Sequence, residues 1–331
     1  MDGYTSIHTN SIEKRKRKKM KEGILLCGHG SRRPAAVSSF KRLVAILKER
    51  YQDRYDVDYG FLEFNHPTYE AAVERMYLDG VRKVYALPVI LFAGSHAKND
   101  IPFELNTLQT YHDDLTISMA KHIGVSSFLL DLAAKRIQET EKKYPKIDRK
   151  ETCLIVVGRG TTDPDANSDV AKLMNMLWEG LGFGFATVGY SGTAYPNIKE
   201  SLAMVDKLGF KRTIVIPFFF FTGVLLERIY GAVTDMQEQS DSEYIYTDPF
   251  GTDELILKAF DERLEEAKNG VANMNCQMCK YRKQVIGFEE YLGQEQVGHH
   301  LNVKGILFEE DEKPGEKQTG LGNKIKKMLG I

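Results

Sequence analysis

The chain carries the sequence ILLCGHGS at residues 24–31, where a short apolar run ends in a histidine between two glycines. An apolar run of this length that stops at a glycine is typical of a buried strand followed by a turn. The next segment, 35–50, predicts an amphipathic helix because its apolar residues recur at spacings of three and four. These residues are Val37, Phe40, Val44 and Leu47. The stretch therefore predicts a strand, a tight turn at His29 and a helix.

The same alternation continues along the chain. Strand-like apolar runs follow at 57–62 and 84–91, and a helix is predicted to begin at Pro67, since proline is favoured in a first helical turn. Strands separated by single helices are joined by right-handed crossovers into a parallel sheet. The predicted fold class is α/β, with doubly wound parallel sheets.

An internal repeat doubles this pattern. Four blocks return about 130 residues later in the chain. They are CGHGS at 27–31 with VGRGT at 157–161, NHP at 65–67 with AYP at 194–196, GVRKV at 80–84 with GFKRT at 209–213, and PVILFAG at 88–94 with PFFFFTG at 217–223. A repeat this long indicates a domain duplication. We therefore expect two homologous α/β halves, 23–140 and 151–269, with a basic disordered arm at 1–22 and a loosely ordered tail at 270–331.

The duplication separates residues that serve the fold from residues that serve chemistry. The glycines beside position 29 persist in both halves, so they are assigned to a shared turn. Three side chains suited to metal binding or proton transfer occur in the first half alone. His29 is matched by Arg159, His96 by Leu225 and Glu63 by Gly192. The first half is therefore the predicted catalytic half.

These three side chains are expected to meet at one edge of the first sheet. His29 and His96 come shortly after the ends of predicted strands, and Glu63 follows another. Ligands of open α/β sheets bind beyond the carboxyl ends of the strands. Neutral imidazole binds Co²⁺, Ni²⁺, Fe²⁺ and Zn²⁺, and a carboxylate accepts protons. We predict that His29 and His96 bind a divalent metal and that Glu63 serves as a proton acceptor.

The composition excludes several classes of protein. Lys and Arg number 45 against 46 Asp and Glu, a net charge of −1, which argues against a dedicated nucleic-acid binder. The longest apolar run, 214–221, is too short to span a bilayer, and the N-terminus shows no secretory signal. We expect a cytoplasmic protein that binds neither nucleic acid nor membranes. The composition leaves the oligomeric state open, including a homodimer.

The tail carries a second chemical motif. Cys276 and Cys279 form a Cys-x-x-Cys, and two thiolates at this spacing suit a soft metal or an iron–sulfur cluster. Because a complete site needs more ligands, the others would come from another subunit, a small-molecule thiol, or His299 and His300. The other cysteines are expected to be buried in strands. They are Cys27 and Cys153.

Four of these features form a familiar set. They are GHGSR at 28–32, FLE at 61–63, Pro67, and the run from Pro88 through His96 to Pro102. The set resembles the CbiX/SirB class of sirohydrochlorin chelatases, related to the cobaltochelatases and ferrochelatases of the class II chelatase fold. The resemblance covers both halves, 23–269. In the tail, Met274, Cys276 and Cys279 resemble the Met-x-Cys-x-x-Cys of the long cobaltochelatase form, which is associated with an iron–sulfur centre.

The resemblance implies a fold and an activity. The two parallel sheets are expected to face a central cleft, and the implied reaction is insertion of Co²⁺ into sirohydrochlorin in anaerobic cobalamin biosynthesis. His29 and His96 would hold the metal, and Glu63 would take up protons with them. ATP is not implied, and the chain has no GxxxxGK[S/T] loop. Three basic side chains near the histidines are implied to pair with the substrate's carboxylates. They are Arg32, Arg33 and Lys98.

Several alternatives stay open at this point. Similar ligand sets accept Fe²⁺ or Ni²⁺, so a ferrochelatase for siroheme is the nearest alternative. A cobalt or nickel carrier would use the same histidines without catalysis. An α/β hydrolase would need a Gly-x-Ser-x-Gly turn, and the nearest sequence, GYSGT at 189–193, departs from it at the last position.

Overall fold

The computed structural model describes residues 21–272, 274–275, 286–287 and 289–306. Cys276 and Cys279 lie outside these residues. Within the described ranges, no helix combines the length and the apolar character needed to cross a membrane.

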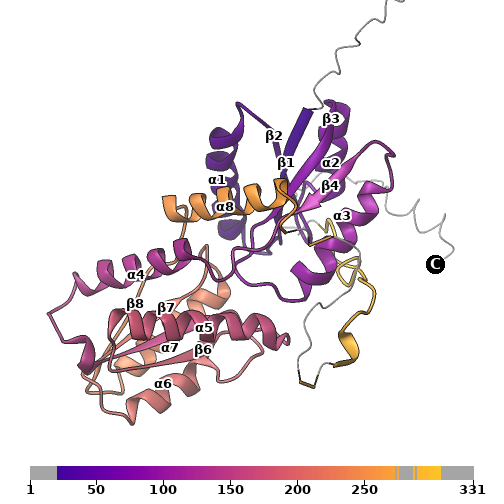
Figure 1. Ribbon diagram of the computed structural model, residues 1–331. Coiled ribbons are helices and arrows are strands. Elements are labelled where there is room, and N and C mark those ends of the chain that lie inside the picture. Colours follow the sequence, from indigo (N-terminus) through magenta and orange to yellow (C-terminus); the bar gives the residue numbers. More distant parts are fainter. Residues whose placement is uncertain (1–20, 273, 276–285, 288, 307–331) are drawn as a thin grey trace, which may run out of the picture.

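The first half is a four-stranded parallel sheet with the order β2-β1-β3-β4 (Figure 1). Its strands are β1 (Lys21–Gly28), β2 (Asp56–Phe61), β3 (Val81–Pro88) and β4 (Thr116–Met119). The connecting helices are α1 (Pro34–Tyr51), α2 (Tyr69–Leu78) and α3 (Ile101–Gln109), and a single π-helical turn, η1 (His96–Asp100), leads into α3. The parallel sheet with single-helix crossovers is the arrangement that the sequence predicts.

Three predicted boundaries are wrong by a few residues. Strand β1 begins at Lys21, inside the predicted arm, because Lys21 pairs with β3 and its ammonium lies 2.7 Å from Asp56. Helix α2 begins at Tyr69 and not at Pro67, because the Thr68 side chain accepts a hydrogen bond from the backbone N–H of Ala71 and caps the helix. Strand β3 ends at Pro88, three residues before the expected position 91.

The second half repeats the first. Its sheet has the order β6-β5-β7-β8, again parallel throughout. The strands are β5 (Thr152–Gly158), β6 (Phe185–Tyr190), β7 (Arg212–Pro217) and β8 (Glu243–Tyr246), and the helices are α5 (Pro164–Leu181), α6 (Ile198–Asp206) and α7 (Val224–Gln237). Both halves also place a cis prolyl peptide after the second strand, at Pro67 and Pro196. The duplication seen in the sequence is thus a duplication of structure.

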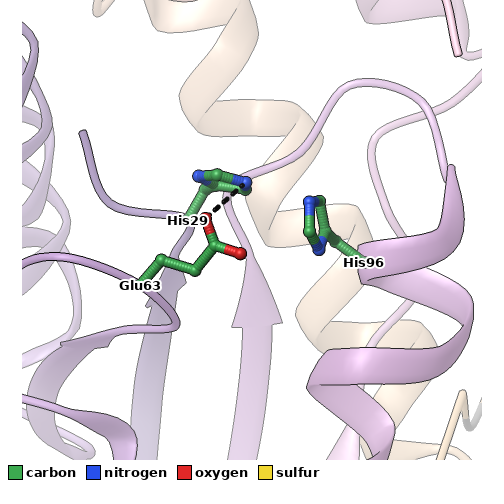
Figure 2. A group of neighbouring side chains, drawn as sticks. All are labelled: His29, Glu63 and His96. Carbon is green, nitrogen blue, oxygen red and sulfur yellow. Dashed lines mark ion pairs between the residues drawn. The ribbon is translucent and has the colours of Figure 1, made fainter. Parts of the chain in front are cut away.

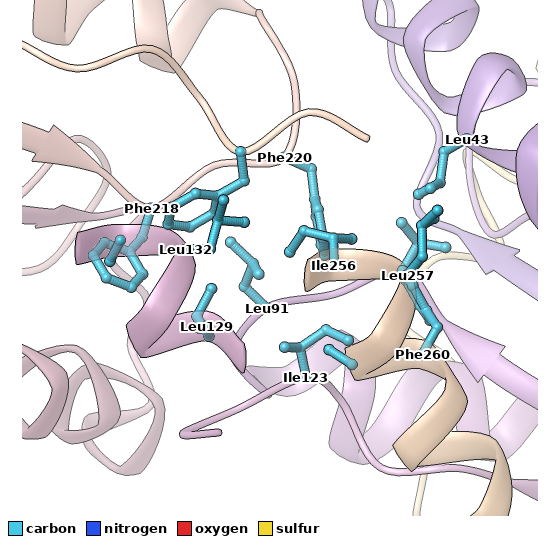
Figure 3. Close-up of a cluster of buried hydrophobic side chains, with 14 of the residues drawn as sticks. Leu43, Leu91, Ile123, Leu129, Leu132, Phe218, Phe220, Ile256, Leu257 and Phe260 are labelled. Carbon is cyan, nitrogen blue, oxygen red and sulfur yellow. The ribbon is translucent and has the colours of Figure 1, made fainter. Parts of the chain in front are cut away.

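The last helix of each half crosses to the other half. Helix α4 (Ser127–Glu141) packs on β7 and α5, whereas α8 (Glu254–Lys268) packs on β3 and β4 (Figure 1). The two helices also contact each other, and their buried apolar side chains join both halves in one continuous core (Figure 3). The division at 140 and 151 therefore describes the chain in sequence, while in space the halves exchange a helix. Each fully buried Leu or Phe in this core contributes about 1.5–3 kcal/mol.

The described residues of the tail are more ordered than the sequence suggests. Asn275 is buried, and its amide accepts from the backbone N–H of Met119 and donates to the carbonyl of Ile117. After the short 3-10 turn η3 (Glu289–Tyr291), residues up to 306 run along the first half, where the His300 side chain is buried. The expectation of a loosely ordered appendage is wrong for these residues, because paired polar groups dock them on the first half.

Candidate metal centre

Neighbouring strands deliver three side chains to one point. His29 follows β1, Glu63 follows β2, and His96 opens the turn η1 after β3; in the sheet β1 lies between β2 and β3. One ligand atom from each residue lies within 4.8 Å of the others (Figure 2). The expected convergence of the two imidazoles and the carboxylate is therefore found.

Backbone pairing holds Glu63 beside His29. The N–H of Glu63 donates to the carbonyl of His29 at 2.9 Å, which continues the β1–β2 ladder by one residue. Gly30 permits this approach, because its φ is 96° and a Cβ built there would lie 2.0 Å from the carbonyl oxygen of Glu63. The glycine of the repeated motif thus serves the close contact of two loops.

The His29 ring presents an unprotonated nitrogen to the centre. Its Nδ1 lies 3.0 Å from the carbonyl oxygen of Gly30, which accepts only if Nδ1 carries the proton. Nε2 then keeps its lone pair; it is buried, has no hydrogen-bond partner and lies 3.7 Å from Glu63 Oε2. A buried nitrogen lone pair aimed at a carboxylate and a second imidazole fits a metal ligand.

His96 has the same arrangement through a carboxylate. Its Nδ1 lies 2.8 Å from Asp100 Oδ2, one helical turn away and almost fully buried. With the proton on Nδ1, the lone pair of Nε2 is available to a metal, and the carboxylate fixes the orientation of the ring. The centroids of the His29 and His96 rings lie 4.6 Å apart at an angle of 77°. This geometry allows both rings to bind one ion.

The electrostatic environment of the centre favours the binding of a cation. Burial, followed by repulsion from His96, lowers the pKa of His29 to about 4, so this imidazole is neutral at physiological pH. Burial alone would raise the pKa of Asp100, but interactions with His300 and His96 outweigh it and hold this pKa well below its usual range. A neutral ligand with an ionised supporting carboxylate suits a divalent ion.

Comparison with known proteins agrees with this arrangement. The family model named CbiX matches residues 23–140 and 153–267, which takes in both sheets and all three residues of the centre. The chain belongs to the CbiX family.

Relatives of this CbiX-family chain include enzymes named for two metals. A sirohydrochlorin cobaltochelatase of Priestia megaterium is 29% identical over 280 residues, covering 84% of this chain and 88% of the relative. A sirohydrochlorin ferrochelatase of the same organism is 29% identical over 212 residues, covering 63% and 76%. The solved structure of SirB from Bacillus subtilis with Fe³⁺ superposes with a TM-score of 0.68 at 26% identity, over 76% of this chain and 98% of that one. The predicted class II chelatase fold is thereby confirmed.

The three basic residues predicted to bind the substrate differ from one another in their surroundings in this CbiX-family chain. Arg32 and Arg33 are exposed, and the Arg32 guanidinium lies 5.0 Å from the centroid of the Phe64 ring. Lys98 is instead engaged with the second half: its ammonium lies 2.5 Å from Asp163 and 3.0 Å from Asp165. These two ion pairs balance the charge of Lys98 and connect the two halves, and the contact of Lys98 with the substrate stays a prediction.

Two further residues of the site were not assigned from the sequence. Asp100 lay in the motif around His96, but its support of the ring depends on the π-helical turn. Arg159 replaces His29 in the second half; its side chain is exposed, and its charge contributes to the lowered pKa of His29. The repeat itself was the signal for Arg159, because it aligns the arginine with a metal ligand.

The structure also bears on the predicted core cysteines and on the hydrolase alternative. Cys27 and Cys153 are free and buried, as predicted, and burial raises the pKa of the Cys153 thiol to about 12. The Ser191 hydroxyl donates to the carbonyl of Leu225, so this serine is not activated by a base as a hydrolase nucleophile would be. The hydrolase alternative is therefore not supported.

The buried His300 of the tail is expected to make the stability of the protein depend on pH. Burial alone would lower the pKa of His300, but the Asp100 and Glu104 carboxylates outweigh it and raise this pKa to about 9. Because the folded pKa lies above the unfolded value near 6.5, the stabilisation is complete below pH 6.5 and is lost as the pH rises through 9. Between pH 6 and pH 10 we expect the wild type to lose up to about 3 kcal/mol more unfolding free energy than His300→Gln.

Urea unfolding of both proteins at the two pH values measures this difference. Lys304 also faces Glu104, with 2.5 Å between the ammonium and the carboxylate, and it is unchanged in both proteins. Equal losses in the wild type and His300→Gln would contradict the charged pairing of His300.

Proposed function

We propose that this chain inserts a divalent metal into sirohydrochlorin without nucleotide hydrolysis. The observation that carries the proposal is the pair of imidazoles, His29 and His96, each with Nδ1 hydrogen-bonded and each with a ligand atom within 4.8 Å of the other and of a Glu63 oxygen. A carboxylate next to two imidazoles supplies both a metal site and a proton acceptor. Family membership and the names of the relatives support the same reaction.

The proposed steps divide the work among three side chains. The metal substrate binds to the two Nε2 atoms, and the macrocycle enters beside it. Two pyrrole N–H bonds break as metal–nitrogen bonds form, so two protons leave and no electrons are transferred. Glu63 accepts these protons and passes them to solvent, because both Nδ1 atoms already carry protons and both Nε2 atoms hold the metal.

Cobalt is the metal that we propose for the cell, with iron as the alternative. Coverage favours cobalt: at equal identity, the similarity to the Priestia megaterium cobaltochelatase extends over 280 residues and that to the ferrochelatase of the same organism over 212. The decisive assay follows the absorption spectrum of sirohydrochlorin with Co²⁺ and Fe²⁺ in parallel under anaerobic conditions. Faster insertion of Fe²⁺ at equal free metal would overturn the cobalt assignment.

A metal carrier is the alternative from another class. It would use the same two histidines, so metal binding alone does not separate the two functions. The spectrum does: a carrier binds Co²⁺ with His29 and His96 yet leaves sirohydrochlorin unmetallated beyond the spontaneous rate.

The substrate's carboxylates are proposed to meet the exposed arginines. Arg159 is the most informative of these, because it projects from the second half at the position equivalent to His29. A hydrogen bond to a charged group contributes about 1.5–3 kcal/mol, so Arg159→Gln is expected to raise the KM for sirohydrochlorin roughly 10-fold with kcat largely kept. Steady-state kinetics with the metal saturating measures it.

Arg54 provides the matched control. It is also exposed, but it precedes β2 and therefore lies at the opposite edge of the sheet. Arg54→Gln is expected to leave the KM unchanged. An unchanged KM in Arg159→Gln as well would remove Arg159 from the substrate site.

The remaining parts of the proposal rest on the sequence. They are an iron–sulfur cluster held by Cys276 and Cys279, a cytoplasmic location and a place in anaerobic cobalamin biosynthesis. For the cluster, the test is iron and sulfide analysis of anaerobically purified wild type and of the Cys276→Ser, Cys279→Ser double variant.

A further inference from the structure

The C-terminal segment 296–304 lies against the turn that carries His96. Asn99 is fully buried, and its amide oxygen accepts from the backbone N–H of Val297 at 2.6 Å while its nitrogen donates to the Val297 carbonyl. Gln296 adds a hydrogen bond to the carbonyl of Lys98 at 3.1 Å. The segment therefore binds the backbone and side chains of η1, close to the metal centre.

One carboxylate connects this segment with the metal ligand. Asp100 receives His96 Nδ1 on Oδ2, whereas its Oδ1 receives the backbone N–H of His299 at 2.8 Å and the Asn99 amide at 3.1 Å. The imidazole of His300 faces the same Oδ1 as an ion pair at 3.7 Å. Oδ2 of Asp100 thus holds His96, whereas Oδ1 accepts from the tail and from Asn99.

His300 is itself held from its other side. Its Nε2 lies 3.0 Å from Glu104 Oε1, and Lys304 pairs with Glu104 Oε2. Two carboxylates on η1 and α3 therefore alternate with two cations from the tail, and the His300 side chain between them is fully buried. An imidazole locked between two carboxylates fixes the rotamer of each.

We propose that the tail segment 296–304 is a latch that positions His96 through Asp100, with His300 as the positioning residue. The inference rests on the proposed function only in taking His96 as a metal ligand. The effect of the latch can therefore be measured by metal binding, without the tetrapyrrole. Without His300, Asp100 loses a charged partner on Oδ1, and the carboxylate that orients His96 is held on that side by the His299 N–H and the Asn99 amide alone. Loss of a group that is hydrogen-bonded directly to a metal ligand, as Asp100 is to His96, typically lowers metal affinity about 10- to 100-fold, and loss of His300 is expected to cause part of that loss through Asp100.

The test titrates Co²⁺ into the full-length protein without tetrapyrrole and follows the visible ligand-field absorption of the bound ion. His300→Ala is expected to raise the dissociation constant by up to about 10-fold and to change the band shape, with an unchanged circular dichroism spectrum. His300→Gln fills more of the site and serves as the second variant if the alanine protein is not folded; the same direction is expected. An unaltered dissociation constant and spectrum in a folded His300 variant would overturn the latch.

A matched control separates positioning from general docking of the tail. His66 also binds the tail, through Nε2 at 2.8 Å from the carbonyl of Gly305, but it makes no contact with Asp100 among the interactions of the described residues. His66→Ala is expected to leave the Co²⁺ titration unchanged. An equal loss in His66→Ala would assign the effect to docking as such and contradict the route through Asp100.

A double-variant cycle tests the route directly. In an Asp100→Asn background, His300→Ala is expected to cause no further weakening of Co²⁺ binding, whereas additive effects would contradict the latch. The readout also separates this inference from the proposed function. If the wild type binds Co²⁺ through His96 but fails to metallate sirohydrochlorin, the chelatase proposal fails while the cycle still decides the latch.

Discussion

Alanine at His29 or at His96 is expected to lower the rate of metal insertion under limiting Co²⁺ by roughly 100-fold or more, since loss of a mere supporting partner already costs a metal ligand about 10- to 100-fold in affinity. Each variant removes one of the two imidazoles that meet beside Glu63. The remaining imidazole and the carboxylate cannot replace it, because the loops after β1 and β2 and the turn η1 fix their positions. Initial rates of sirohydrochlorin metallation, together with Co²⁺ titration, measure the loss.

The matched control is a histidine with a similar partner at the other edge of the sheet. His112 Nε2 lies 2.9 Å from Glu74, and its ring stacks on Tyr77 at the end of α2. His112→Ala is expected to retain the wild-type insertion rate. All three variants should remain folded, because the rings of His29 and His96 lie at the rim and outside the apolar core. Wild-type rates in His29→Ala or His96→Ala would refute the metal centre.

The convergence of the centre was predictable from the sequence because parallel sheets have a simple rule. Residues that follow adjacent parallel strands lie at one edge, and the repeat marked which of them were absent from the second half. These two observations were sufficient to predict that His29, Glu63 and His96 lie together. The sequence likewise predicted a turn at Gly30, and in the structure only glycine fits there between two loops.

Contacts between distant segments were not predictable in the same way. Lys98 stood near His96 in the sequence and was assigned to the substrate, but its partners, Asp163 and Asp165, come from the other half. The exchange of α4 and α8 between the halves has the same origin, since an amphipathic helix reveals its apolar face but not the sheet that covers it.

The tail shows this limit most clearly. Its composition resembles that of a solvated appendage, because the residues that dock it are Asn, His and Lys rather than a periodic apolar stripe. Their partners, Asn99, Asp100 and Glu104, lie about 200 residues earlier, so no local pattern links them. A buried polar network of this kind is satisfied only in three dimensions.

Substitution of Glu63, the proposed proton acceptor, is expected to have the second large effect on the reaction. Glu63→Gln keeps the size of the side chain and one oxygen but removes the base, and kcat for insertion at saturating metal is expected to fall about 100- to 10,000-fold. His29 cannot substitute for Glu63, because burial lowers its pKa to about 4 and makes it a weak base, and its Nε2 lone pair is used by the metal. Co²⁺ affinity is expected to change less than in His96→Ala. Steady-state kcat and a Co²⁺ titration give the two numbers.

The split between these numbers decides what Glu63 does. A proton acceptor loses kcat and keeps metal affinity, whereas a metal ligand loses affinity and recovers its rate at high Co²⁺; the second pattern would contradict the assignment. Glu63→Asp is the matched variant, because it keeps the carboxylate and shortens its reach toward His29 Nε2, now 3.7 Å away. Partial recovery of kcat in Glu63→Asp over Glu63→Gln is expected, since the backbone N–H of residue 63 stays bonded to the His29 carbonyl and still holds the loop in place.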